Sequence, residues 1–137
     1  MTQVLERDAA LTPIRLLPIN SAADSKGSIH DDEKAREMGY RGGLVSGSTI
    51  LAYMSRLMYA SFGADWLADS ALSGRLRRPV YEGGEVTIEG AVVEGPTDAN
   101  DRRVTVELRV LTPEGEVAAI GQASCRVTGT GSEGNGA

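Results

Sequence analysis

Apolar residues recur at two different periods along this chain, and the change of period divides it into two parts. Between Ser48 and Phe62 they return every three or four positions, with no Gly or Pro to interrupt them. This spacing predicts one long helix, and further apolar residues around its circumference predict that the helix is largely buried. From Ala71 onward apolar and polar residues alternate, which is the period of half-buried β-strands.

Turn signals separate these strands and define the rest of the plan. EGGE at 82–85, GPTDAND at 95–101 and PEG at 113–115 predict turns, so the last three strands form an antiparallel meander. A short apolar segment, Ile14 to Ile19, predicts a first strand. Asp31 and Asp32 are expected to cap a short helix that runs to Met38. The pattern therefore predicts an α+β domain in which an antiparallel sheet of about five strands wraps one long central helix.

The chain is long enough for one domain with one core. It has 137 residues, of which 41% are hydrophobic. We expect a loose leader over residues 1–10, the domain over 11–128, and a disordered tail over 129–137, where Gly, Ser, Glu and Asn dominate. A single sheet around one helix leaves unpaired edges, so we expect a homodimer whose sheets join edge to edge.

The amino-acid composition limits the classes of molecule that the protein is expected to bind. Aromatic residues make up only 4% of the chain and its net charge is -5, which argues against nucleic-acid binding. The basic cluster of Arg75, Arg77 and Arg78 is either a solvated strand edge or, at Arg75 and Arg77, a site for the phosphates of a small anionic ligand.

Our expectations about the cellular compartment and about cofactors rest on features that the sequence lacks. The lone Cys125 excludes an internal disulfide and a cysteine-only metal site, and we expect neither a metal nor a cofactor. There is no signal-like N-terminus and no apolar run near the roughly 20 residues that span a bilayer. The expectation is a cytoplasmic protein with no membrane partner.

Candidate chemistry is concentrated just before the long helix. The only histidine, His30, lies in a polar loop, where a lone histidine is more often a solvent-exposed or locally bonded residue than a catalytic one. Ser46, Gly47 and Ser48 are small residues that allow another group to approach the first-turn amides, which carry roughly half a positive charge. An acyl carbonyl oxygen or a phosphate would be stabilised there.

Two segments carry a resemblance to a known family. SIHDDEKAREMGYRGGLVSGSTILAYM and GRLRRPVYEGGEVTI resemble the MaoC-like hot-dog proteins, whose best known members are (R)-specific enoyl-CoA hydratases and dehydratases, and the resemblance covers residues 20 to 127. It implies a single hot-dog fold and a lyase, a hydratase or dehydratase acting on the acyl (enoyl) thioester of CoA or of an acyl-carrier protein. The acid-base pair implied by the resemblance is Asp24 and His30.

The catalytic motif departs from the family pattern at several positions. Counted from Asp24, His30 falls one place late, and the Asn-Pro pair between them is absent. The histidine at the helix start is replaced by Ser46, and Gly84 stands where an Asp is usual. The amide donors for an enolate oxygen need no special side chain, so that half of the site is retained.

Other functions stay open. One is a non-catalytic acyl-binding or partner subunit of a hot-dog dimer, and another is a biosynthetic enzyme that uses the same pocket for a different reaction. A hot-dog thioesterase is the least expected, because the sequence between Arg41 and Ala60 has no Asp or Glu to activate water.

Overall fold

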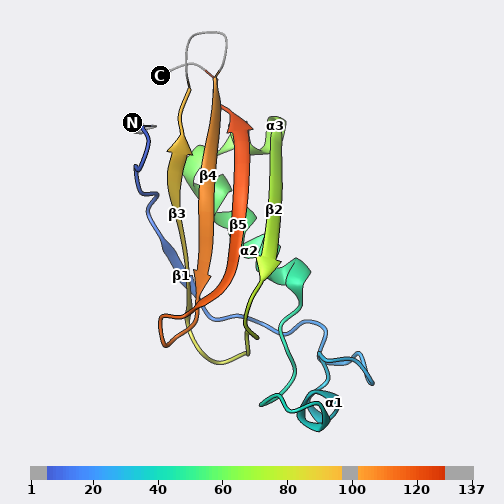
Figure 1. The fold of residues 1–137 in the computed structure, drawn as a ribbon. Helices are drawn as coiled ribbons and strands as arrows, with labels where there is room; N and C mark the ends of the chain where they lie inside the picture. Colours follow the sequence, from blue (N-terminus) through green and yellow to red (C-terminus); the bar gives the residue numbers. More distant parts are fainter. Residues whose placement is uncertain (1–5, 97–101, 129–137) are drawn as a thin grey trace.

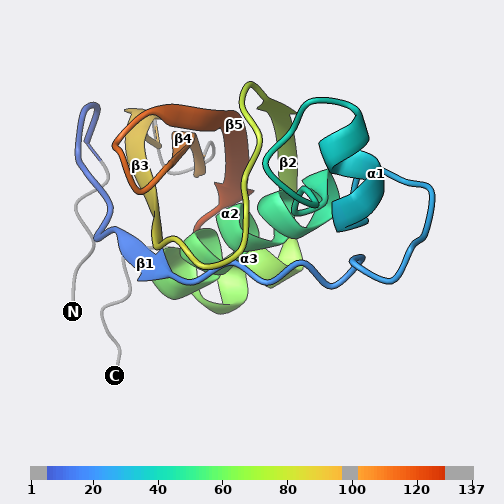
Figure 2. The same cartoon turned by 90° about the horizontal axis from the view of Figure 1, so that it is seen from below.

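A five-stranded antiparallel sheet wraps one long helix in the computed structural model, which describes residues 6–96 and 102–128 (Figure 1). The strand order is β1-β3-β4-β5-β2, and α2 lies across the concave side (Figure 2). The predicted α+β plan is confirmed. The elements are β1 (Ile14–Leu16), α1 (Asp32–Glu37), α2 (Gly47–Phe62), α3 (Ala64–Ala68), β2 (Ser70–Leu76), β3 (Val86–Glu94), β4 (Arg103–Leu111) and β5 (Val117–Arg126).

The long helix forms where its apolar spacing predicts it. Ser46 precedes α2 in an extended conformation, and its hydroxyl accepts a hydrogen bond from the Thr49 amide at 3.3 Å. The helix ends at Gly63, whose φ of 59° is readily adopted only by glycine. The residues buried against the sheet keep the spacing of a single face, and they are Ile50, Met54, Leu57 and Met58.

Two glycines on the inner face of the sheet let α2 come close. Gly74 of β2 pairs with Gly121 of β5. A Cβ on Gly74 would lie 2.6 Å from Leu51 Cδ2, and one on Gly121 would lie 2.6 Å from Met54 Sδ. The volume that two side chains would occupy is therefore filled by the helix, which is how a close-packed core forms at this position.

The meander of β3, β4 and β5 is also confirmed, and β2 joins it beside β5. This order leaves β1 and β2 at the two edges of the sheet (Figure 1). β1 ends at Leu16, earlier than the predicted strand, because Pro18 has no N–H and the Ile19 amide donates instead to the Tyr53 hydroxyl at 3.1 Å.

The chain before β1 runs beside β3. The amides of Asp8 and Leu11 donate to the carbonyls of Val92 and Gly90, at 2.6 and 2.9 Å. The first five residues of the expected leader and the expected disordered tail, 129–137, lie outside the described residues.

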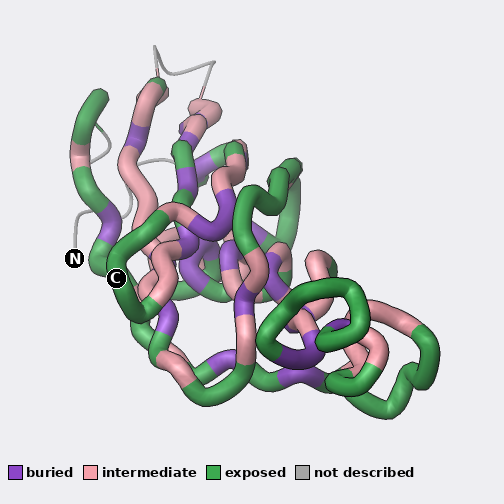
Figure 3. The backbone as a smooth tube through the Cα atoms, turned by 60° about the horizontal axis from the view of Figure 1, so that its bottom comes forward, coloured by how far each residue is buried: buried purple, intermediate pink, exposed green. Residues whose placement is uncertain are grey.

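The buried side chains belong mostly to α2 and to the inner face of the sheet. The loop over residues 21–27, by contrast, is almost wholly exposed (Figure 3). None of the helices in the described parts of the chain combines the length and apolar character needed to cross a bilayer.

Candidate functional site

The segment that carries His30 is held tightly against the segment that leads into α2. The Leu44 amide donates to the Ile29 carbonyl at 2.9 Å, and the Asn20 side-chain amide donates to the His30 carbonyl at 2.8 Å. Gly43 is buried between them, and a Cβ there would lie 2.1 Å from the His30 carbonyl oxygen. The backbone approach at this point is closer than any residue other than glycine allows.

The imidazole of His30 has a defined orientation. Its Nδ1 lies 2.8 Å from the Leu44 carbonyl oxygen, and the ring is half-buried. A carbonyl can only accept, so Nδ1 carries the hydrogen and donates. In the neutral ring the Nε2 lone pair is then available to accept a proton.

Asp32 fastens the same two segments together. Its Oδ1 accepts a hydrogen bond from the Gly43 amide at 2.7 Å. The predicted capping role is therefore wrong for Asp32, whose carboxylate contacts a distant segment. Asp31 occupies the N-cap position of α1, but its side chain makes no capping hydrogen bond.

Asp24 is placed differently from His30. It is exposed, and the chain between the two residues makes tight turns around Gly27, whose φ is 84°. Among the described residues, no hydrogen bond joins the Asp24 side chain to His30. The structure thus orients one member of the predicted pair and leaves the other on the surface of the loop.

The start of α2 presents backbone amides. Those of Gly47 and Ser48 precede the first intrahelical hydrogen bonds, so the helix offers them no acceptor. The Ser46 hydroxyl lies 3.1 Å from the Ser48 hydroxyl and 2.9 Å from that of Thr49. A Cβ on Gly47 would meet Leu76 Cδ1 at 3.2 Å, which places Leu76 directly over the first turn.

A small cavity adjoins this helix start. Its volume is about 210 Å³, and it contains both apolar and basic side chains. Arg77 lies on its wall, whereas Arg75 lines a separate hollow with Arg109 and Gln122. Of the two arginines predicted to bind an anion, only Arg77 is near the helix start. The lining residues are Tyr40, Leu44, Val45, Leu76, Arg77, Arg78, Pro79 and Val80.

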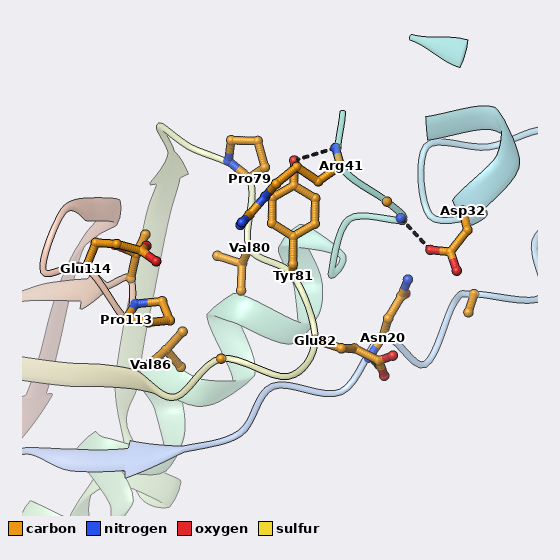
Figure 4. A pocket seen from close by; sticks show the side chains of 15 residues that line it. Asn20, Asp32, Arg41, Pro79, Val80, Tyr81, Glu82, Val86, Pro113 and Glu114 are labelled. Carbon is orange, nitrogen blue, oxygen red and sulfur yellow. Dashed lines mark hydrogen bonds between the residues drawn. The ribbon is translucent and has the colours of Figure 1, made fainter. Parts of the chain in front are cut away.

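A larger cavity of about 490 Å³ is lined in part by residues 79–82 (Figure 4). The Arg41 guanidinium stacks over the Tyr81 ring, 4.4 Å from its centroid, and the Tyr81 hydroxyl accepts from the Arg41 amide at 3.3 Å. Sequence reasoning singled out neither residue. The lining of this cavity includes neither His30 nor any residue of α2, and the same is true of the 210 Å³ cavity.

Within residues 6–96 and 102–128, no three His, Cys, Asp or Glu side chains come together in an arrangement that could hold a metal ion. The chemistry available at the site is that of one imidazole, hydroxyl groups and backbone amides.

An antiparallel five-stranded sheet wrapped around one helix, in this order, is the hot-dog fold, and comparison with solved structures shows the same fold. The chain is similar to a chain of the ChsH1-ChsH2 complex from Mycobacterium tuberculosis, with a TM-score of 0.71 and 20% identity over 91% of this chain and 100% of that one. No protein-family model matches the chain, and neither does any curated protein sequence.

Two further solved structures are named for their chemistry. The (R)-hydratase from A. caviae involved in PHA biosynthesis has a TM-score of 0.68 and 24% identity, over 92% of this chain and 99% of that one. The MaoC-like dehydratase from Rhodospirillum rubrum has a TM-score of 0.68 and 23% identity, over 90% and 92%. These likenesses establish the fold.

Proposed function

We propose that the protein is a hydratase or dehydratase that acts on an enoyl thioester of CoA or of a carrier protein. The observation that carries this proposal is the hydrogen bond from His30 Nδ1 to the Leu44 carbonyl. It directs the basic Nε2 away from Leu44, and Leu44 lies only two residues before the helix-capping Ser46. The proposed base is thus hydrogen-bonded to the segment that leads into α2, where the amides of Gly47 and Ser48 have no acceptor within the helix.

The imidazole of His30 and the amides of Gly47 and Ser48 each have a role in the reaction. In hydration, His30 Nε2 takes a proton from water, and the water oxygen forms a bond to the β-carbon of the enoyl group. The electrons of the double bond move to the thioester oxygen, where the amides of Gly47 and Ser48 stabilise the enolate. The proton taken up by His30 is then returned to the α-carbon, which restores the neutral imidazole and completes the addition; dehydration is the reverse.

Asp24 is proposed as the second acid-base group, sharing the water with His30. For this role the loop would have to bring the exposed carboxylate within roughly 2.6 to 3.2 Å of that water. Arg77 is proposed to meet a phosphate of the thioester carrier, since it lies on the wall of the cavity beside the helix start.

The likeness to an (R)-hydratase and to a MaoC-like dehydratase supports the choice of reaction, at identities of 24% and 23%. One observation favours a second candidate, an acyl-binding partner subunit without its own catalysis. Asp24 is exposed and makes no hydrogen bond to His30, so the acid-base pair is not assembled in a single chain.

We also propose that two copies of the chain pair through β2. Within the described residues this strand pairs only with β5, and six of its seven residues are exposed. An exposed edge of this length favours pairing with a second edge. Light scattering should give twice the chain mass of 14.4 kDa, and the monomer mass at all micromolar concentrations would contradict the pairing.

The enzymatic proposal is tested by steady-state hydration of crotonyl and longer enoyl thioesters. Wild type should turn over, and both His30→Ala and Asp24→Asn should lose about 100-fold or more in kcat/KM. Glu33→Gln, which neutralises an exposed carboxylate on α1, is the matched control and should keep full activity. Wild type that binds these thioesters without converting them would establish the partner-subunit function instead.

A further inference from the structure

Leu76 is the last residue of the edge strand β2 that faces α2. Side chains alternate along a strand, so Leu72, Gly74 and Leu76 share the inner face. Gly74 lies against Leu51 and Met54 in the middle of the helix. Leu76 lies one step further along, over Gly47 at the start of the helix, with its Cδ1 and Cγ 3.2 and 3.9 Å from the position of a Gly47 Cβ.

Leu76 is packed on one side only. Its cross-strand neighbour is Ala119, which has a single methyl group, and the outer edge of β2 has no partner strand among the described residues. The side chain is consequently 49% exposed, although it points to the face that forms the core.

Leu76 lines the 210 Å³ cavity together with Leu44 and Val45. Leu44 is the residue whose carbonyl orients the His30 ring. The same leucine thus contacts the helix start and faces the segment that positions the proposed base.

We propose that Leu76 limits the bulk of the acyl group next to the thioester carbonyl, and this rests on the function proposed above. An oxygen that accepts from the Gly47 and Ser48 amides lies about 2.7–3.1 Å from them. Its carbonyl carbon and α-carbon follow within two bonds, so they lie beside the Leu76 methyl groups. An unbranched enoyl group fits past Leu76, whereas a methyl branch on the α-carbon collides with it.

The test compares crotonyl and 2-methylcrotonyl thioesters. Leu76→Ala should raise the ratio of kcat/KM for the branched over the unbranched substrate by at least about 10-fold, the usual effect of one methylene in an apolar pocket. Leu76→Phe should lower it. Leu72→Ala is the matched control, because it makes the same truncation on the same face of β2, away from the helix start. Its ratio should equal that of wild type.

The outcomes separate this inference from the proposed function. If wild type hydrates crotonyl thioester and Leu76→Ala leaves the ratio unchanged, the inference is wrong and the function stands. An equal change in Leu72→Ala would also overturn it, by showing a general loosening of the edge strand. If wild type neither hydrates nor binds the two thioesters, both fall together. If it binds without turnover, the ratio of dissociation constants for butyryl and isobutyryl thioesters takes the place of kcat/KM, with the same expected shifts.

Discussion

Replacing Gly43 by alanine should disable the site while leaving most of the fold in place. The added Cβ would lie 2.1 Å from the His30 carbonyl oxygen and 2.8 Å from the His30 carbonyl carbon. Both are backbone atoms, so no rotamer change relieves the collision. The same Cβ would lie 2.8 Å from the side-chain nitrogen of Asn20, which donates to that carbonyl.

The size of the effect follows from these distances. Real Cβ atoms essentially never approach another heavy atom closer than 3.0 Å, so the two segments must separate by about 1 Å. A displacement of that size at a reacting group costs on the order of 100-fold in rate. Overpacking of a buried position also costs about 1–3 kcal/mol of stability, which lowers the unfolding temperature by about 4–12 °C in a chain of this size.

The assay pairs crotonyl thioester hydration with thermal unfolding followed by circular dichroism. Gly42→Ala is the comparison variant: the neighbouring Cβ would lie 3.2 Å from Asp32 Oδ1, a side-chain atom that needs to shift by only a few tenths of an ångström and can keep its hydrogen bond to the Gly43 amide. It should lose much less activity and stability than Gly43→Ala. Gly43→Ala with wild-type rate and wild-type unfolding temperature would refute the close approach of these segments.

Three further changes test other parts of the structure. Gly121→Ala places a Cβ 2.6 Å from Met54 Sδ and should lower the free energy of unfolding in urea by about 1–3 kcal/mol. Adding Met54→Val should recover part of this stability. An unchanged urea midpoint in Gly121→Ala would mean that α2 does not lie this close to the sheet. Ser46→Ala removes the α2 cap and should cost about 1 kcal/mol, whereas Ser48→Ala should cost much less. Burial, with Asp65 nearby, raises the pKa of Cys125 from 9.0 to about 11. The unfolded chain therefore loses this proton first, so stability should fall as the pH rises from 9.0 to about 11, and fall less in Cys125→Ala.

The hydrophobic patterns of single segments predicted the helices and strands better than they predicted how these elements pair in the sheet. The long helix and the meander follow from periods of 3.6 and 2 that each segment carries within itself. β2 reads as one more alternating strand, and nothing in its own sequence says that it pairs with β5 at the edge of the sheet. That pairing depends on Gly74 and Gly121 meeting under Met54, a contact between three distant segments.

The sequence identified several residues of the candidate site, but it did not predict the contacts between them. His30 and Gly47 were singled out, one as the lone imidazole and the other as the small residue at a helix start. The partner of Asp32 could not be predicted, because a carboxylate just before a helix usually caps it, and here it accepts from the Gly43 amide instead. Gly43 is one of two adjacent glycines, and only the packing of the His30 backbone distinguishes it from Gly42.

The lone histidine is also a built-in NMR probe of the candidate site. Because the sequence contains one histidine, a ¹⁵N spectrum of the untagged chain contains a single pair of imidazole nitrogens, and both belong to the candidate site. The hydrogen bond to Leu44 assigns the protonated shift to Nδ1 and the unprotonated shift to Nε2. A thioester that contacts the ring will shift these two signals, which can be assigned without selective labelling. A polyhistidine tag would hide them, so the purification scheme decides whether the site can be observed directly.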